Sequence, residues 1–221
     1  MARELFTLRA AAALFFRHRS PWILLFILGA LITGRIFLPA AVTRSELLIA
    51  LSASVYWPLQ EWWMHRWLLH LPAFSLFGRT IEPSFARLHR LHHADPADIP
   101  LSFLPISTIF GALFAFSGLV YSVSTSIPVT LSFMSAATTS TLLYEWVHFL
   151  THTDYRPRGR YYRAIWKLHR WHHYKNEGYW FSFTVPIIDR LLGTGPAPGD
   201  VPKSPTVRSL NARFGEGEGE G

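Results

Sequence analysis

Four long apolar runs limit what this chain can fold into. They cover about residues 21–38, 47–63, 101–121 and 127–150. A helix needs about 20 apolar residues to cross the hydrocarbon core of a bilayer. In a chain that is 50% hydrophobic, these runs predict an all-α integral membrane protein with four transmembrane helices arranged as two hairpins. The second run has roughly 17 residues, near the lower limit for a span, so we expect it to be tilted or to reach only part-way across.

Two hairpins place the segments before, between and after them on one side of the membrane. These are residues 1–20, an amphipathic lead-in with four arginines, residues 64–100, and everything after residue 150. They hold most of the Arg and Lys, whereas the loop at 122–126 has none. Because loops rich in Arg and Lys stay in the cytoplasm, we expect both termini and a helical cap to be cytoplasmic.

The chain is long enough for one folded unit, and we assign it to residues 21–196. Residues 197–221 are rich in Pro and Gly and end in Gly-Glu repeats. Such repeats cannot bury a core, so we expect this tail to be largely disordered.

Ten of the eleven histidines fall in four clusters, all on the predicted cap side. A six-residue motif, Leu-His-Arg-x-His-His, occurs at 88–93 and again at 168–173. On a helix its three imidazoles lie within roughly a 100° arc of one face. Each copy follows a histidine pair, so that the full set is His65, His70, His89, His92, His93, His148, His152, His169, His172 and His173. His18 lies outside every cluster, and an isolated histidine is usually a hydrogen-bonded core residue.

This concentration of imidazoles predicts a metal site. Imidazole binds Zn, Fe, Cu and Ni, and the chain has no cysteine for thiolate ligands, disulfides or Fe–S clusters. Ten rings are too many for one ion, but two ions would take about five each and keep open coordination positions. Open positions are typical of catalytic sites. The ligand type alone does not select the metal.

The formal net charge of +7 raises the question of nucleic acid as a partner. The basic residues lie between apolar runs and around the histidine clusters, and they form no basic helix or RNA-binding motif. A membrane surface is therefore the better partner, and we expect no nucleic acid.

Four boxes carry a resemblance to a known family. They are Glu61-Trp-Trp-Met-His65 to His70, Leu88 to His93 with Pro96 and Asp98, Tyr144-Glu145 to His152, and Lys167 to Asn176 with the trailing Asp189-x3-Gly193-Thr194. Over roughly residues 56–195 the chain resembles the fatty acid hydroxylase/sterol desaturase superfamily of integral-membrane di-iron enzymes. Within it, the sphingolipid fatty acid 2-hydroxylases are the most similar.

The resemblance implies two Fe ions held by the ten histidines, with Zn possible in an isolated or crystallised form. It also implies O2 as cosubstrate and an external electron donor. The chain lacks the cytochrome b5-like domain fused to those hydroxylases, so we expect a separate electron-transfer protein that is cytochrome b5-, ferredoxin- or reductase-like. The expected reaction is hydroxylation of a fatty acyl chain of a membrane lipid near its carboxyl end, that is, 2-hydroxylation.

Three carboxylates are candidates for supporting roles. Glu61 and Glu145 share helix faces with the histidines and can accept the free ring N–H of a ligand. For both residues, an equally open interpretation is an interfacial carboxylate that forms an ion pair with Arg. Asp189 is a candidate for capping or orienting the last box.

Other functions remain open at this stage. Within the superfamily they are sterol desaturation, sterol-methyl oxidation and carotenoid-ring hydroxylation, although the third box and the Asp-x3-Gly-Thr ending favour an acyl group. From a different class, a zinc-binding membrane protein or a metal transporter has to be considered. Transport predicts polar ligands within the spans, whereas these ligands lie at the ends of spans.

Overall fold

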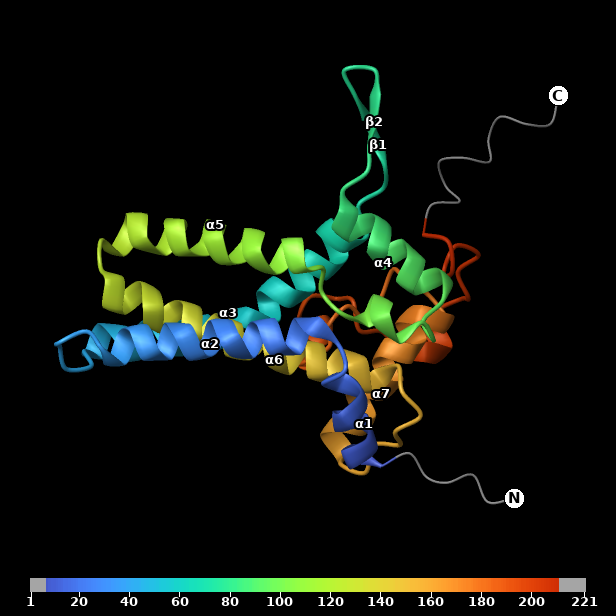
Figure 1. Ribbon diagram of the computed structural model, residues 1–221. Coiled ribbons are helices and arrows are strands. Elements are labelled where there is room, and N and C mark those ends of the chain that lie inside the picture. The colour runs from blue at the N-terminus through green and yellow to red at the C-terminus, as the bar shows by residue number, and fades with distance from the viewer. Residues whose placement is uncertain (1–6, 211–221) are drawn as a thin grey trace.

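The structure, a computed structural model, describes residues 7–210, and its helices fall into two groups. In this part of the chain, four long helices form a bundle, and shorter elements gather at one end of it as a cap (Figure 1). The bundle helices are α2 (Arg19–Ile36), α3 (Arg44–Trp63), α5 (Ile106–Ser124) and α6 (Ile127–Thr151).

The cap contains both copies of the histidine motif, each on a helix as the spacing predicts. Its elements are α1 (Leu8–Phe15), the π-helix η1 (Met64–Leu69), the hairpin β1 (Phe74–Leu76) and β2 (Arg79–Ile81), α4 (Ser84–Ala94), the 3₁₀-helix η2 (Ile99–Ser102), α7 (Arg160–Tyr174), α8 (Ile187–Leu191) and the 3₁₀-helix η3 (Pro198–Asp200).

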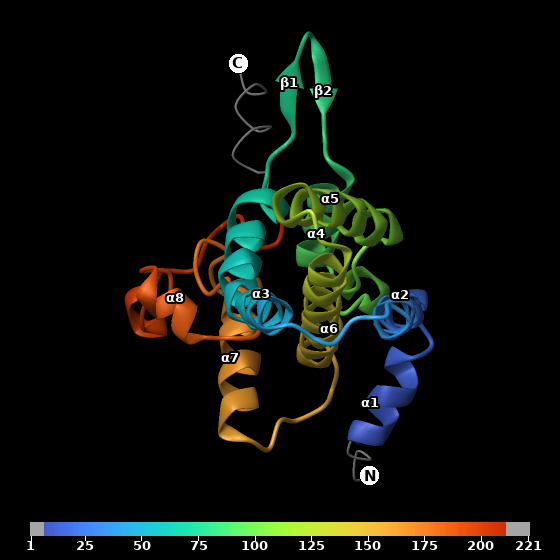
Figure 2. The same cartoon turned by 90° about the vertical axis from the view of Figure 1, so that its left-hand side faces the viewer.

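Helix α6 is the centre of the bundle and packs against α2, α3 and α5. Figure 2, which looks along the bundle, shows α2 and α3 on either side of α6, with α5 above it. At the end far from the cap, Glu46 forms an ion pair with Arg35 and accepts a 2.9 Å hydrogen bond from Ser132. This buried carboxylate ties α2, α3 and α6 together.

The outer faces of the bundle are apolar. Within the described residues, two helical stretches have the length and composition of membrane spans, Arg19–Ile36 and Ile99–Ser124. Only 6% of the apolar window of the second stretch is buried inside the molecule, and Phe114 on it is 85% exposed. The core helix of a soluble protein would bury such residues. These two stretches match the first and third predicted spans and are candidate membrane spans.

The end of α3 differs from the expected winding. An α-helix places residues five apart about 140° around its axis, so the spacing of His65 and His70 predicts that the helix ends near His70. The helix does end there, but its last six residues, Met64–Leu69, are wound as a π-helix. This wider turn brings residues i and i+5 onto one side, and the rings of His65 and His70 lie 5.0 Å apart.

The C-terminal segment also differs from expectation. Residues 197–210 are packed against the cap, with Val201 and Val207 buried. The hydroxyl of Ser204 donates to Glu177 at 2.9 Å, and the Arg208 guanidinium donates to the Ala94 carbonyl at 2.7 Å. Buried valines and side-chain hydrogen bonds therefore anchor this stretch in spite of its Pro and Gly content. The Gly-Glu repeats lie outside the described residues.

Candidate metal centre

The ten predicted histidines all converge where the cap meets the bundle. Within the described residues they form two groups, and the candidate ligand atoms of each group lie within 4.8 Å of one another. One group is His65, His70, His89, His93 and His172; the other is His92, His148, His152, His169 and His173. We refer to them as the first and the second group. The rings are buried, except that His70 in the first group and His152 in the second are partly exposed.

The two motif copies exchange their middle histidines. Helix α4 supplies its i and i+4 residues, His89 and His93, to the first group, but its i+3 residue, His92, to the second. Helix α7 does the reverse, with His172 in the first group. The groups consequently adjoin, and the ring centroids of His93 and His173 are 4.2 Å apart.

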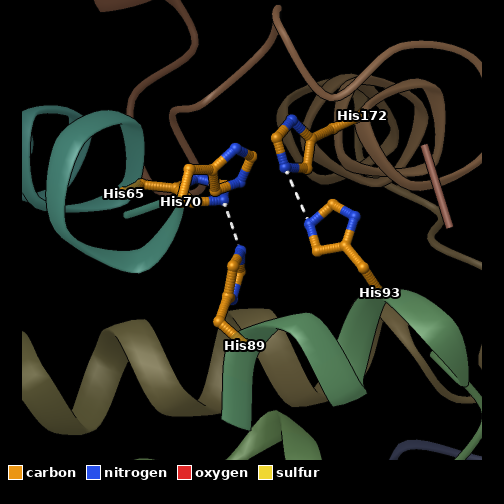
Figure 3. A group of neighbouring side chains, drawn as sticks. All are labelled: His65, His70, His89, His93 and His172. Carbon is orange, nitrogen blue, oxygen red and sulfur yellow. Dashed lines mark hydrogen bonds between the residues drawn. The ribbon is translucent and has the colours of Figure 1, made fainter. Parts of the chain in front are cut away.

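Backbone carbonyls fix the tautomers in the first group. The Nδ1 of His93 lies 3.1 Å from the Val207 carbonyl, and the Nδ1 of His172 lies 2.7 Å from the Tyr179 carbonyl. Since a carbonyl only accepts, both protons reside on Nδ1. The two Nε2 atoms then face each other with lone pairs at 3.2 Å (Figure 3). Two nitrogens bound at about 2.1 Å to one ion lie roughly 3.0–3.4 Å apart, so the spacing fits a shared cation.

The same arrangement recurs elsewhere in both groups. In the first, His65 donates from Nδ1 to the Phe181 carbonyl at 2.6 Å, and its Nε2 faces that of His89 at 3.2 Å (Figure 3). In the second, His148 donates from Nδ1 to the Ser102 carbonyl at 2.9 Å, and its Nε2 faces that of His152 at 3.2 Å. Each carbonyl therefore aims an unprotonated nitrogen into the group.

Burial keeps these imidazoles neutral. Loss of solvent lowers the pKa of His172 to about 4 and the pKa of His93 and His173 well below the usual value. Both ring nitrogens of His173 and the Nε2 of His70 are buried without a hydrogen-bond partner among the described residues. Buried polar atoms are rarely left unpaired, and the neutral form is the one that binds metals. The donor set therefore fits two metal ions.

The three predicted carboxylates have other roles than direct contact with the rings. Glu61 accepts from the backbone N–H groups of Phe183 and Thr184, at 2.5 and 2.9 Å. Asp189 accepts from the N–H groups of Phe181 and Ser182, each at 2.9 Å. Both carboxylates thus position the loop at 180–184, which supplies the carbonyl that orients His65. Contrary to expectation, Glu61 forms no hydrogen bond with a histidine ring of the described chain, because its carboxylate oxygens accept from N–H and hydroxyl groups of this loop.

Glu145 likewise accepts from the Ser20 hydroxyl at 2.5 Å and from the Leu104 N–H at 2.9 Å. It therefore connects α2 and the start of α5 to α6. Neither of the two readings for this residue, ring contact or pairing with Arg, describes it.

A cavity of about 460 Å³ leads to the histidines. Its walls are mostly apolar and come from α3, η1, α4, η2, α5 and α6. It reaches His65 and His89 of the first group and His148 of the second. A second cavity of about 110 Å³ continues between α2, α5 and α6 and shares Trp57 and Ala112 with the first. An elongated apolar molecule can therefore lie along α5 with one end at both groups.

Phe183 is a site residue that the sequence reasoning missed. Its buried ring stacks on His65 at 4.6 Å, contacts His148 at 4.8 Å and lines the larger cavity. It lies between the last box and Asp189 in a short segment without a motif, so only the folded loop brings it to the site.

The sequence profile of the fatty acid hydroxylase family matches residues 50–194. The chain belongs to this family. The match confirms the resemblance seen in the four boxes and spans both histidine groups. A curated relative is the dihydroceramide fatty acyl 2-hydroxylase FAH2 of Arabidopsis thaliana, 26% identical over 142 residues, which are 63% of this chain and 57% of the relative. The chain therefore spans little more than half of that relative.

A solved structure shares the fold of this hydroxylase family member. It is full-length scs7p, in which only the hydroxylase domain is visible, and it superposes with a TM-score of 0.62. The similarity covers 88% of this chain and 68% of the other, at 22% sequence identity. The bundle and cap described above are therefore the fold of a known hydroxylase domain.

Proposed function

We propose that the protein is a membrane-bound di-iron monooxygenase that hydroxylates a fatty acyl chain of a lipid near its carboxyl end. One observation carries this proposal: a single apolar cavity ends at histidines of both groups, so that metal ions held by the two groups would share one substrate space. The Arabidopsis relative is a fatty acyl 2-hydroxylase by name, which supports this position of attack.

The ten histidines would hold the two irons, which activate O2 when bound. Zinc is expected to occupy the same nitrogens in protein isolated without iron, because imidazole binds both metals. One oxygen atom enters a C–H bond and the other leaves as water, so an external donor has to supply two electrons and two protons. We expect that donor to be a separate cytochrome b5-, ferredoxin- or reductase-like protein.

The chain itself binds and orients the lipid. Apolar walls exclude water along the cavity, and the loop at 180–184, held by Glu61 and Asp189, places Phe183 against the histidines. These walls disfavour metal transport, since a translocated ion needs polar groups along its path. The name of the relative favours an acyl substrate over a sterol or a carotenoid.

A parity argument supports four membrane crossings. Each group combines histidines that precede α5 with histidines that follow α6, so the segments before and after this pair lie on the same side. If α5 crosses the bilayer, α6 has to cross back. Helix α1 also lies on the cap side, because Phe15 packs on Phe149 at 5.3 Å; if α2 crosses, α3 has to return. By the distribution of Arg and Lys, the cap side is cytoplasmic.

Incubation with labelled O2 tests the proposed activity. Iron-loaded protein, supplied with a reductase system and a panel of ceramides and free fatty acids, is expected to place one labelled oxygen at the carbon next to the carbonyl. Zinc-loaded protein is the matched control and should give no product, because Zn²⁺ undergoes no redox change. If the iron-loaded protein consumes O2 with none of these lipids, the oxygenase assignment is refuted.

A further inference from the structure

The β1–β2 hairpin is an exposed arm with an aromatic tip. Its two central turn residues, Phe77 and Gly78, both have positive φ, 51° and 72°. Two-residue hairpin turns of this kind favour Asn, Asp or Gly, and a bulky residue there is strained. Phe77 nevertheless occupies the position and is 96% exposed. A strained aromatic residue that packs on nothing within the described chain points to a function for its side chain.

The hairpin has two chemically different faces. Phe74 pairs with Ile81 and Leu76 pairs with Arg79, whereas Ser75 pairs with Thr80 between them. Because side chains alternate across a strand, three apolar residues and Arg79 share one face, and two hydroxyls share the other. All six residues are exposed.

The base of the arm is held rigidly. Arg90, on α4, donates to the Leu71 carbonyl before the hairpin at 2.8 Å and forms an ion pair with Glu82 after it. The Arg90 side chain is only 9% exposed. A single buried guanidinium thus ties both ends of the hairpin to the cap, and the direction of the arm is fixed by the fold.

The arm lies across the bundle axis, where the bundle meets the cap. In Figure 1, where the bundle lies horizontally, the arm projects upward near the start of α5, and its two strands largely overlap. In Figure 2, viewed along the bundle, the strands are seen side by side. One face of the hairpin is therefore turned toward the bundle end, where the candidate spans α2 and α5 would enter the bilayer.

We propose that this hairpin rests on the lipid surface of the leaflet next to the cap. Phe74, Leu76 and Ile81 would enter the boundary between headgroups and acyl chains, about 5–10 Å deep, with Phe77 at the tip. Arg79 on the same face can reach lipid phosphates. The hydroxyl face would remain in water. The apolar face combined with a cation matches a phospholipid surface better than a second copy of this chain, whose identical Arg79 would repel it. This inference rests on the proposed placement of the bundle in a membrane. It does not depend on the proposed hydroxylation reaction.

Single labels can test this placement, because the chain has no cysteine. An environment-sensitive fluorophore is attached to Phe77→Cys, Leu76→Cys or Ser75→Cys in full-length, metal-loaded protein. Each variant is placed in phosphatidylcholine/phosphatidylglycerol nanodiscs that hold one copy. Labels at 77 and 76 should show blue-shifted emission and lose most of it to a quencher near the lipid carbonyls. The label at 75, on the opposite face, should respond mainly to aqueous iodide. Lys203→Cys on the cap is the control for a position outside the bilayer.

Three outcomes would overturn the proposal. The first is equal quenching by iodide at positions 77 and 203. In the second, lipid quenching at 75 exceeds that at 76, so that the hydroxyl face lies on the bilayer. In the third, shielding at 77 occurs only in nanodiscs that hold two copies, which would assign the face to a dimer. Unchanged metal content in every variant verifies folding, and none of these readouts depends on hydroxylase activity.

Discussion

A histidine ring has two nitrogens, and in this protein one of them repeatedly donates a hydrogen bond to a backbone carbonyl. For His65, His93, His148 and His172 the Nδ1 proton goes to a carbonyl. Their Nε2 atoms are therefore unprotonated, and the Nε2 lone pairs point into a histidine group. In the metal-free protein, the pair His93 and His172 holds two such lone pairs against each other at 3.2 Å, which is electrostatically unfavourable. Metal binding is therefore expected to stabilise the fold as well as to complete the site.

Replacement of His173 tests the donor set directly. Within residues 7–210, both its ring nitrogens are buried without a hydrogen-bond partner, so His173→Ala should lose the ion of the second group and nearly all hydroxylation. The matched control is His18→Ala, whose ring stacks on Phe103 at 4.3 Å and lies outside both groups, so this variant should retain normal metal content. Elemental analysis of both purified variants decides the matter, and equal metal content would contradict the assignment of His173.

Glu61 provides a test of a positioning residue. Glu61→Leu removes the acceptors of the Phe183 and Thr184 N–H groups, which frees the loop that orients His65. We expect about a 10–100-fold loss in metal affinity, typical of residues that support ligands. Glu61→Gln keeps one oxygen for both N–H groups and should retain most of the affinity. If the Leu and Gln variants are equally impaired in a chelator competition, the charge of Glu61 matters more than its hydrogen bonds.

The convergence of the ten histidines was predictable from sequence, but the backbone carbonyls that orient their rings were not. Two copies of one motif at i, i+3 and i+4 put three imidazoles on each of two helices, and this holds for α4 and α7. The carbonyls of Phe181 and Val207, by contrast, carry no side-chain signature. Their role depends on where two loops lie after folding, which local spacing does not encode.

Among the elements, α5 offers a way to probe the cavity. Gly111 lines it, and an added side chain would meet open space. Gly111→Leu should therefore obstruct the cavity without destabilising the helix, since Leu is a better helix former than Gly. We expect the ratio of kcat/KM for the longest acyl chains to that for shorter ones to fall roughly tenfold or more.

Gly118 is the matched control on the same helix. It also has open space around it but does not line either cavity. Gly118→Leu should leave the chain-length profile unchanged. A profile that shifts equally in both variants would mean that the cavity described here does not hold the acyl chain.

The segment at 197–210 makes a second element-scale prediction. Truncation after Asp200 removes the Val207 carbonyl that fixes His93 and should weaken metal binding about 10–100-fold. Truncation after Leu210 removes only residues that lie outside the described part and should leave metal binding intact. The stabilisation that added zinc gives against thermal unfolding is measured for both truncated variants. If the variant truncated after Asp200 is stabilised as much as the other, the segment at 197–210 does not support the site.

Two elements escaped sequence prediction for identifiable reasons. The π-helix Met64–Leu69 has no composition that separates it from an α-helix, and only the five-residue spacing of His65 and His70 hinted at unusual winding. The C-terminal segment was expected to be disordered because of its Pro and Gly residues. Its order comes from tertiary contacts, chiefly the Glu177 carboxylate accepting from two hydroxyls.

For the whole molecule, the prediction concerns sidedness. Ser122→Cys, at the end of α5 away from the cap, and Lys203→Cys on the cap should react with an impermeant maleimide from opposite sides of sealed vesicles. Lys203→Cys should react only after permeabilisation if the cap is cytoplasmic. Reaction of both positions from the same side would rule out the two-hairpin arrangement. The absence of native cysteine makes each label unambiguous.

The exchange of middle histidines between α4 and α7 has a consequence for the timing of synthesis. His93 and His172 face each other across 79 residues of sequence, and the second group has the same dependence on α7. At roughly 5–20 residues per second, translation needs about 4–16 s to pass from one to the other. During that interval neither group is complete, so a nascent chain can capture an ion only with a partial set of donors. If the two groups hold metal, tight loading has to await the synthesis of α7, and a chain cleaved before α7 would lack donors of both groups.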